Sequence, residues 1–194
     1  MRKLILQEFV TLDGLAAGPK NSVDFVPAAT RGDASFGREQ LAFIETIDTM
    51  LLGRVTYELF VGYWPAVTQG DEKPFADRFN AARKLVFSKT LDRAPWGDWG
   101  EARIVKTSPE RAVADLKAQT GKDIVLFGSI SLAQSLIAAG LVDVYRLVVC
   151  PVVLGEGRRL FGDKVEQLAL QRSSTKAFDR GAALLEYVPT RAGS

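Results

Sequence analysis

The feature that most constrains the fold is an apolar segment that ends in glycine and continues as an amphipathic segment. Residues 124–127 are four apolar residues, Gly128 and Ser129 follow, and Leu132 and Leu136 then recur four residues apart. This pattern predicts a buried strand, a tight turn and a helix. Because the first turn of a helix leaves backbone N–H groups unpaired and glycine lets a ligand approach the main chain, such a turn suits a phosphate group.

The chain contains a second segment of this kind. Residues 50–52 are apolar and end in Gly53, and Arg54 and Thr56 stand at the start of the next predicted helix. Two such turns, one with a guanidinium group, could hold a ligand with several phosphates from both ends. The alternative is that the glycines only turn the chain and that a serine at 129 or 131 only caps the helix.

Strands and helices alternate over three quarters of the chain, and a pair of strands follows. Apolar or β-branched segments predict strands at residues 4–10, 50–52, 84–89, 102–105, 124–127, 144–154 with an interruption at Pro151, 166–173 and 182–188. Helices are expected at about 38–48, after Arg54, at 75–82, from Pro109 to Gly121 and at 130–140. This order predicts an α/β fold: a mixed, mainly parallel sheet flanked by helices, with a C-terminal antiparallel strand pair, in one domain spanning residues 1–194. Residues 15–36 show no period and are predicted to be a long functional loop.

Composition excludes several kinds of chemistry. The chain has no histidine, which rules out Ser-His-Asp and Cys-His catalysis and zinc sites with histidine ligands, and we expect no metal. The net charge is +2 without long runs of one sign, which argues against a nucleic-acid partner or a membrane surface. A pI near 8.7 is compatible with an anionic small-molecule substrate.

Cys150 is the single cysteine and lies in an apolar run, so no disulfide framework exists and a reducing compartment is expected. The N-terminus reaches Gln7 and Glu8 after three apolar residues, which is too polar for a signal peptide, and no apolar run approaches the ~20 residues of a membrane span. These features predict a cytoplasmic protein. If the strand that contains Cys150 lies at a sheet edge, it also suggests a homodimer.

Six motifs, in order along the chain, resemble those of the dihydrofolate reductase superfamily. The motifs are Thr-Leu-Asp-Gly at 11–14, Gly-Arg-Val-Thr-Tyr-Glu at 53–58, Phe-Ser-Lys-Thr at 87–90, Phe-Gly-Ser at 127–129, Gly-Leu-Val-Asp at 140–143 and Pro-Val-Val-Leu-Gly-Glu-Gly-Arg-Arg-Leu-Phe at 151–161. The chain is most similar to the C-terminal reductase domain of the bifunctional riboflavin biosynthesis deaminase-reductase, from about residue 3 to 188. This resemblance implies a dihydrofolate-reductase-like fold, a homodimer and a reductase that uses NADPH.

The resemblance also implies cofactor-binding residues. Gly53, Arg54, Val55 and Thr56 would lie at the cofactor phosphates, and Gly128, Ser129 and Ile130 would hold the pyrophosphate on a helix N-terminus. Ser88 and Lys89 would lie near the adenosine and its 2′-phosphate. The dinucleotide fingerprint GxGxxG is missing, since Gly155 and Gly157 are followed by no third glycine in register. Basic residues at strand ends therefore favour NADPH over NADH.

Hydride transfer needs little covalent help from a protein, but the site can deliver a proton. The resemblance places Asp13 over the nicotinamide and the substrate, which makes it the first candidate acid, with an ordinary turn residue as the alternative. Glu156 is the second candidate, or a solvated loop acid. Tyr57 and Trp64 could stack on a heterocycle or belong to the core. Arg158 and Arg159 could meet a substrate phosphate or face water.

The chain departs from the folate reductases at one position. Those enzymes hold the pterin with a carboxylate about one helix length before the Gly-Arg turn, where this chain has Gly37 and Arg38, with Glu39 only nearby. The predicted function is therefore NADPH-dependent reduction of a small heterocycle, such as 5-amino-6-(5-phosphoribosylamino)uracil. Reduction of a pteridine, a non-catalytic NADPH-binding module and a purely structural domain are the alternatives.

Overall fold

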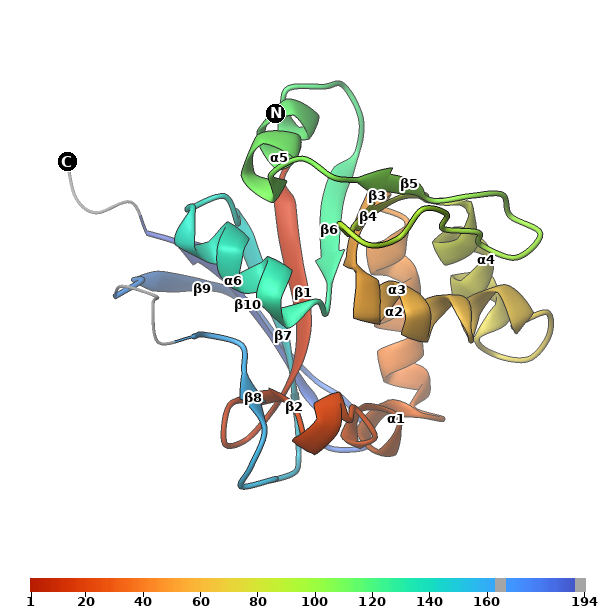
Figure 1. Cartoon of the computed structure of the whole chain (residues 1–194). Helices are drawn as coiled ribbons and strands as arrows, with labels where there is room; N and C mark the ends of the chain where they lie inside the picture. The colour runs from red at the N-terminus through yellow and green to blue at the C-terminus, as the bar shows by residue number, and fades with distance from the viewer. Residues whose placement is uncertain (163–166, 191–194) are drawn as a thin grey trace.

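The computed structural model describes residues 1–162 and 167–190 and contains one eight-stranded sheet (Figure 1). The strand order is β5-β4-β3-β6-β1-β7-β10-β9. The strands of this sheet are β1 (Leu4–Thr11), β3 (Ile47–Gly53), β4 (Arg83–Phe87), β5 (Arg103–Val105), β6 (Asp123–Phe127), β7 (Val144–Cys150), β9 (Leu170–Ala177) and β10 (Ala183–Pro189). A separate antiparallel pair is formed by β2 (Leu15–Ala17) and β8 (Arg158–Arg159).

Helices cover both faces of the sheet (Figure 1). They are α1 (Phe25–Thr30), α2 (Ala34–Ile44), α3 (Arg54–Val61), α4 (Lys73–Ala81), α5 (Pro109–Lys117) and α6 (Ile130–Ala138), with short 3₁₀ turns η1 (Pro19–Asn21) and η2 (Trp64–Ala66). One apolar cluster packs α5 and α6 on the sheet, and another packs α2, α3 and α4 on the opposite face. The central strands are buried from both sides, which explains their continuous apolar runs.

The sheet confirms the predicted fold class. The pairs that join β5, β4, β3, β6, β1 and β7 are all parallel, and β10 is antiparallel to both β7 and β9. The strand that contains Cys150 ends at that residue instead of continuing to 154, because Pro151 follows. It lies between β1 and β10 and not at an edge, so this reason for expecting a dimer is wrong.

The segment 15–36 is more ordered than the sequence predicts. It holds β2, η1, α1 and the first turn of α2. Asp33 caps α2 by accepting a hydrogen bond from the N–H of Phe36 at 2.9 Å, so the helix begins four residues before the predicted start at 38. Its predicted end is also wrong, because Ile47 and Asp48 belong to β3.

The strand predicted at 166–173 is displaced toward the C-terminus. Residue 166 lies outside the described residues, residues 167–169 are irregular, and β9 runs from Leu170 to Ala177. Its side chains are mostly polar and exposed, so the strand carries no apolar run that would mark its limits in the sequence. The predicted strand at 182–188 agrees with β10 to within one residue.

Candidate active site

The two glycine turns lie at the point where the direction of the chain through the sheet reverses. β3 leads through α3 to β4 on one side, whereas its neighbour β6 leads through α6 to β7 on the other. The two strands are parallel, so their carboxyl ends meet at the same edge, toward the bottom of Figure 1. In open α/β sheets, ligands bind in the crevice at such a reversal.

A single hydroxyl group connects the two turns. Ser129 Oγ accepts a hydrogen bond from the N–H of Gly53 at 2.8 Å, and it lies 3.0 Å from both Thr56 Oγ1 and the carbonyl oxygen of Phe127. The turns approach so closely that a Cβ added to Gly128 would lie 3.4 Å from Thr56 Oγ1. The N-termini of α3 and α6 are therefore fixed side by side.

The backbone of the second turn is left-handed at two successive residues. Gly128 has φ +52° and Ser129 has φ +62°. This region is open to glycine but costs other residues roughly 1–2 kcal/mol. Ser129 adopts this left-handed conformation, and its hydroxyl is already bonded to the Gly53 turn. The backbone of Ser129 is therefore the part of the residue that can contact a ligand.

Arginines lie at both helix N-termini. Arg54 Nη1 donates to both carboxylate oxygens of Glu58, at 2.8 and 2.9 Å, one helical turn further along α3. Arg158 Nη2 donates to Ser131 Oγ in the first turn of α6 at 2.9 Å, and its Nη1 donates to Asn21. All of these groups are exposed, so an anion can compete for either guanidinium.

The remaining predicted cofactor residues lie on the same edge. Gly53 is paired with Phe87, so Ser88 and Lys89 follow β4 next to the first turn. Ser88 Oγ accepts hydrogen bonds from the N–H groups of Thr90 and Leu91, at 3.2 and 3.1 Å, and thus shapes its own turn. Val55 and Lys89 are exposed, whereas Ile130 is buried and anchors α6.

Asp13 joins two loops at the mouth of the site. Its carboxylate accepts hydrogen bonds from the Thr11 hydroxyl and from the N–H groups of Gly155 (2.8 Å) and Leu154 (3.3 Å). The Thr11 hydroxyl and then the Gly155 N–H hold the pKa of Asp13 below its usual value. These contacts stabilise the ionised form, so they favour a brace between loops over a proton donor. Glu156 follows directly in the braced loop and is exposed.

Both aromatic candidates for substrate stacking belong to the core. Tyr57 is buried beside Trp96, and its hydroxyl donates to the carbonyl oxygen of Pro95 at 2.8 Å. Trp64 is partly buried against Phe79 and other aromatic rings of the α4 face. Neither ring is free to cover a heterocycle.

Sequence reasoning missed a buried carboxyl group at this site. Glu8 is 5% exposed, its Oε1 accepts a hydrogen bond from the N–H of Phe9 at 3.1 Å, and its Oε2 has no protein partner. Burial raises the pKa of Glu8 to about 8, although the Phe9 N–H opposes the shift. The signal in the sequence was a charged residue, beside Gln7, inside a mainly apolar strand.

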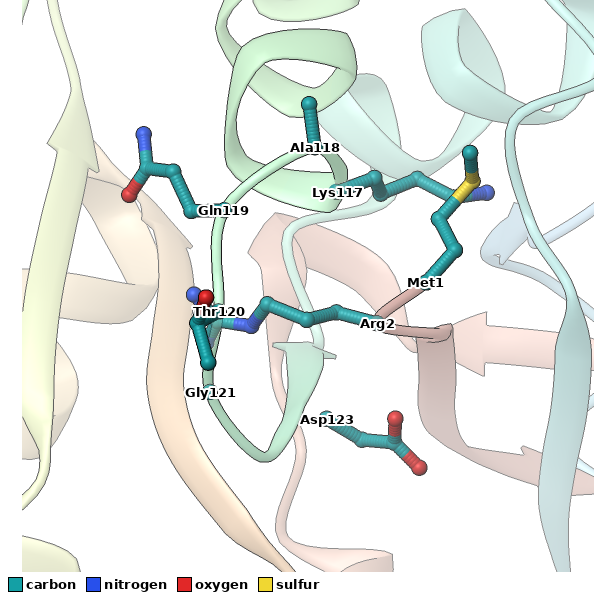
Figure 2. A pocket seen from close by; sticks show the side chains of 8 residues that line it. All are labelled: Met1, Arg2, Lys117, Ala118, Gln119, Thr120, Gly121 and Asp123. Atoms are coloured by element: carbon teal, nitrogen blue, oxygen red, sulfur yellow. The ribbon is translucent and has the colours of Figure 1, made fainter.

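One pocket lies at the opposite edge of the sheet from these turns. It has a volume of about 400 Å³ and is lined by Met1, Arg2, Lys117 and Gly121 among others, at the amino-terminal edge of the sheet (Figure 2). Arg2 is already paired there with Asp48. Among the described residues, no cluster of three or more carboxylate or cysteine side chains can hold a metal ion, and no helix is long and apolar enough to cross a membrane.

The sheet order, the flanking helices and the paired turns define a dihydrofolate-reductase-like fold. The chain belongs to the RibD C-terminal domain family, whose model matches residues 2–184. This match agrees with the resemblance drawn from the six motifs and gives the chain a RibD-like reductase fold.

Individual relatives support the same assignment. The uncharacterized protein YyaP of Bacillus subtilis (strain 168) is 35% identical over 187 residues, which cover 96% of this chain and 94% of YyaP. A crystal structure from Shewanella sp. PV-4, assigned provisionally to riboflavin biosynthesis, has a TM-score of 0.76 at 21% identity and covers 97% of this chain and 99% of its own. Dihydrofolate reductase from Enterococcus faecalis, complexed with NADP(H), has a TM-score of 0.63 at 15% identity and covers 97% of both chains.

Proposed function

We propose that this protein is an NADPH-dependent reductase of a small heterocyclic substrate similar to 5-amino-6-(5-phosphoribosylamino)uracil. The observation that carries the proposal is the contact of the Gly53 and Gly128 turns through Ser129. Two helix N-termini fixed side by side at the reversal of the sheet form a site for a pyrophosphate. Membership of the RibD C-terminal domain family supports the reductase class.

The residues present fit this cofactor. Gly53, Arg54, Val55 and Thr56 on one turn and Gly128, Ser129 and Ile130 on the other would hold the phosphates, with Arg158 nearby. Ser88 and Lys89 would take the adenosine and its 2′-phosphate, which is why we favour NADPH over NADH. When bound, the cofactor would supply a hydride, and the protein would orient it and manage the proton.

We propose that Asp13 and Glu156 act at the mouth of the site. Asp13 fixes the loop that carries Glu156 through the N–H groups of Leu154 and Gly155, so the two acids close over the substrate side together. Asp13 would position this loop as a carboxylate. Glu156 would contact a polar group of the substrate.

The first test is thermal unfolding with each nicotinamide cofactor. A ligand at about 100 times its dissociation constant should stabilise the protein by ~2.7 kcal/mol, which raises Tm by roughly 5–10 °C for a chain of this size. We expect this shift with NADPH and a much smaller one with NADH. No shift with either cofactor would contradict the proposal.

The second test is NADPH oxidation with 5-amino-6-(ribosylamino)uracil 5′-phosphate, with dihydrofolate for comparison. We expect oxidation with the uracil compound and little with dihydrofolate, because α2 has Gly37 and Arg38 where a folate reductase has a carboxylate. Tight binding of NADPH without oxidation would instead indicate a non-catalytic binding module.

We also infer a cytoplasmic homodimer. Cys150 is a buried free thiol, which suits a reducing compartment. β9 is the last strand of the sheet in the described part of the chain and presents an open edge. Sedimentation at micromolar concentration should give about twice the chain mass; a monomer would refute the dimer.

A further inference from the structure

β1 loses its neighbour β6 halfway along its length. The parallel pairing runs from Leu4 opposite Ile124 to Gln7 opposite Phe127, and the last contact is the hydrogen bond from the N–H of Gly128 to the carbonyl oxygen of Gln7 at 3.3 Å. In a strand, the N–H and C=O groups of residues i and i+2 point to the same side. The N–H of Phe9 therefore points into the space that β6 has left.

The carboxyl group of Glu8 occupies this space. Because the N–H of Phe9 donates to Glu8 Oε1, the side chain of Glu8 must curl around to the β6 side of β1. The register that places Gln7 opposite Phe127 puts Glu8 level with Gly128. The carboxyl thus lies in the gap between β1 and the turn that would hold the pyrophosphate.

The second oxygen of this carboxyl is buried without a partner. Oε2 makes no hydrogen bond in the described part of the chain, although Glu8 is only 5% exposed. Alternation along β1 places Glu8 on the face of Leu6 and Val10, both of which belong to the apolar cluster under α6. An orphaned polar atom of this kind calls for a ligand, since a buried polar group without a partner costs roughly 1–3 kcal/mol.

Among residues 1–162 and 167–190, no charged side chain of a neighbouring element stabilises Glu8 as a carboxylate. α6 and β2 contain no ionisable residue, and the single acid of β6, Asp123, lies at its opposite end. β7 contributes Tyr145 on this face, whose pKa burial raises to about 12, while Arg146 bonds Gln7 on the other face. The arginines of β8 are exposed.

We propose that Glu8 is the acid that delivers the proton in the reduction, which would take place in the gap between β1 and the Gly128 turn. This inference rests on the proposed reductase function. When bound, the cofactor would supply a hydride to the carbon of a C=N or C=O group of the substrate, where a C–H bond would form. The π-electron pair moves to the heteroatom, which takes the proton from Glu8 Oε2. Glu8 becomes a carboxylate and regains a proton from solvent after the product leaves.

Asp13 and Glu8 differ in protonation state, and a proton donor must carry a proton. Asp13 is held ionised by three hydrogen-bond donors, whereas Glu8 has one donor and an apolar surrounding. An acid is effective when its pKa lies near the working pH, and the raised pKa of Glu8 keeps its proton available at neutral pH.

The test is the Glu8→Gln substitution, which preserves an oxygen for the N–H of Phe9 but has no proton to give. With NADPH and 5-amino-6-(ribosylamino)uracil 5′-phosphate, we expect kcat to fall by about 10²-fold or more. The dissociation constant of NADPH should stay within about twofold. The wild-type rate should decline above about pH 8, and the residual rate of the variant should lack this decline. Glu45→Gln, an exposed site on the far end of α2, is the matched control.

A measurement without turnover separates this inference from the proposed function. Infrared difference spectra between the wild type and Glu8→Gln should show a protonated carboxyl band at about pH 6 that disappears above about pH 8. An ionised Glu8 at about pH 6 overturns the inference, as does a variant that reduces the substrate at the wild-type rate with the same pH profile. Failure of the proposed function would appear separately, as a wild type that shows no NADPH-induced thermal shift or does not oxidise NADPH with the uracil compound.

Discussion

At the scale of single residues, the site depends on the hydroxyl of Ser129. This residue holds a left-handed conformation that a serine rarely adopts, and its contacts with Gly53 and Thr56 offset that cost. The hydroxyl can donate either to Thr56 Oγ1 or to the carbonyl oxygen of Phe127, but not to both at once. In both cases it still accepts from the N–H of Gly53. It therefore fixes the distance between the two helix N-termini.

The Ser129→Ala substitution should weaken cofactor binding more than it weakens the fold. Loss of one hydrogen bond and the unpaired N–H of Gly53 should lower the free energy of unfolding by about 1–2 kcal/mol. We expect the dissociation constant of NADPH to rise by about tenfold, measured by calorimetry. Ser135→Ala on the same helix removes a hydroxyl that bonds Glu110 instead and should leave NADPH binding unchanged. Equal effects of the two substitutions would contradict the role of Ser129.

Glu8 should also make stability depend on pH. Its pKa is about 8 in the folded protein and near 4.5 in the unfolded chain, so the folded state binds more protons between these values. The contribution of Glu8 to the free energy of unfolding is therefore fully present below about pH 4.5 and is lost as the pH rises through about 8. Urea unfolding of the wild type should show this decline in free energy, and Glu8→Gln should remove it. Identical slopes in the two proteins would show that Glu8 is ionised in the native state.

At the scale of elements, the β2–β8 pair is held to the sheet by short loops and side-chain contacts. Gly157 has φ +156°, and a Cβ there would lie 2.1 Å from the carbonyl oxygen of Ala17. Asp13 adds the link to the N–H groups of Leu154 and Gly155. The pair can therefore cover the site as one unit.

The Asp13→Ala substitution should release this unit. The two loops would lose their shared carboxylate, so we expect cleavage between residues 153 and 159 by a broad-specificity protease to accelerate by about tenfold, since local opening controls proteolysis. Tm should change by only a few degrees, because the main sheet is untouched. Asp24→Ala, an exposed residue that bonds Ser22, is the control. Unchanged cleavage would mean that Asp13 does not brace the loop.

Elements with a local signal could be predicted from the sequence. β6 and β3 contain apolar runs ended by glycine. The Ser108-Pro109 pair is a typical helix start, and Ser108 Oγ caps α5 by accepting from the N–H of Arg111. The limits of α2 and β9 could not be predicted. The aspartate that caps α2 stands in a segment whose composition is typical of a loop. β9 has mostly exposed, polar side chains, so no apolar pattern marks where it begins and ends.

At the scale of the whole molecule, the candidate site was only partly predictable. The glycine turns are local features and could be found one by one, but their contact through Ser129 joins positions 76 residues apart. The burial of Glu8 depends on β2, α6 and β7 folding over the same face, which no local pattern records. The partners of Arg146 could not be predicted either, because this residue lies in an apolar run and its partners are distant in the sequence.

Arg146 connects distant parts of the chain through the sheet. Its guanidinium pairs with Glu39 of α2 at 2.6 Å and with Glu186 of β10, its Nε donates to Gln7 of β1 at 2.8 Å, and it stacks on Phe43. The side chain is only 4% exposed. Both carboxylates are largely buried and are compensated by Arg146, and Glu39 is also paired with Lys176 of β9.

The Arg146→Met substitution should therefore destabilise the whole molecule. Removing one partner of a buried charge pair costs about 3–5 kcal/mol, which corresponds to a fall in Tm of roughly 10 °C for a chain of this size. Lys73→Met removes an exposed pair with Asp77 and should cost no more than about 0.5 kcal/mol. Hydrogen exchange should show β10 losing protection together with α2, because Arg146 is the link between them. Loss of protection confined to β10 would mean that α2 is held by its apolar contacts alone and that the ion pair with Glu39 adds nothing to its stability.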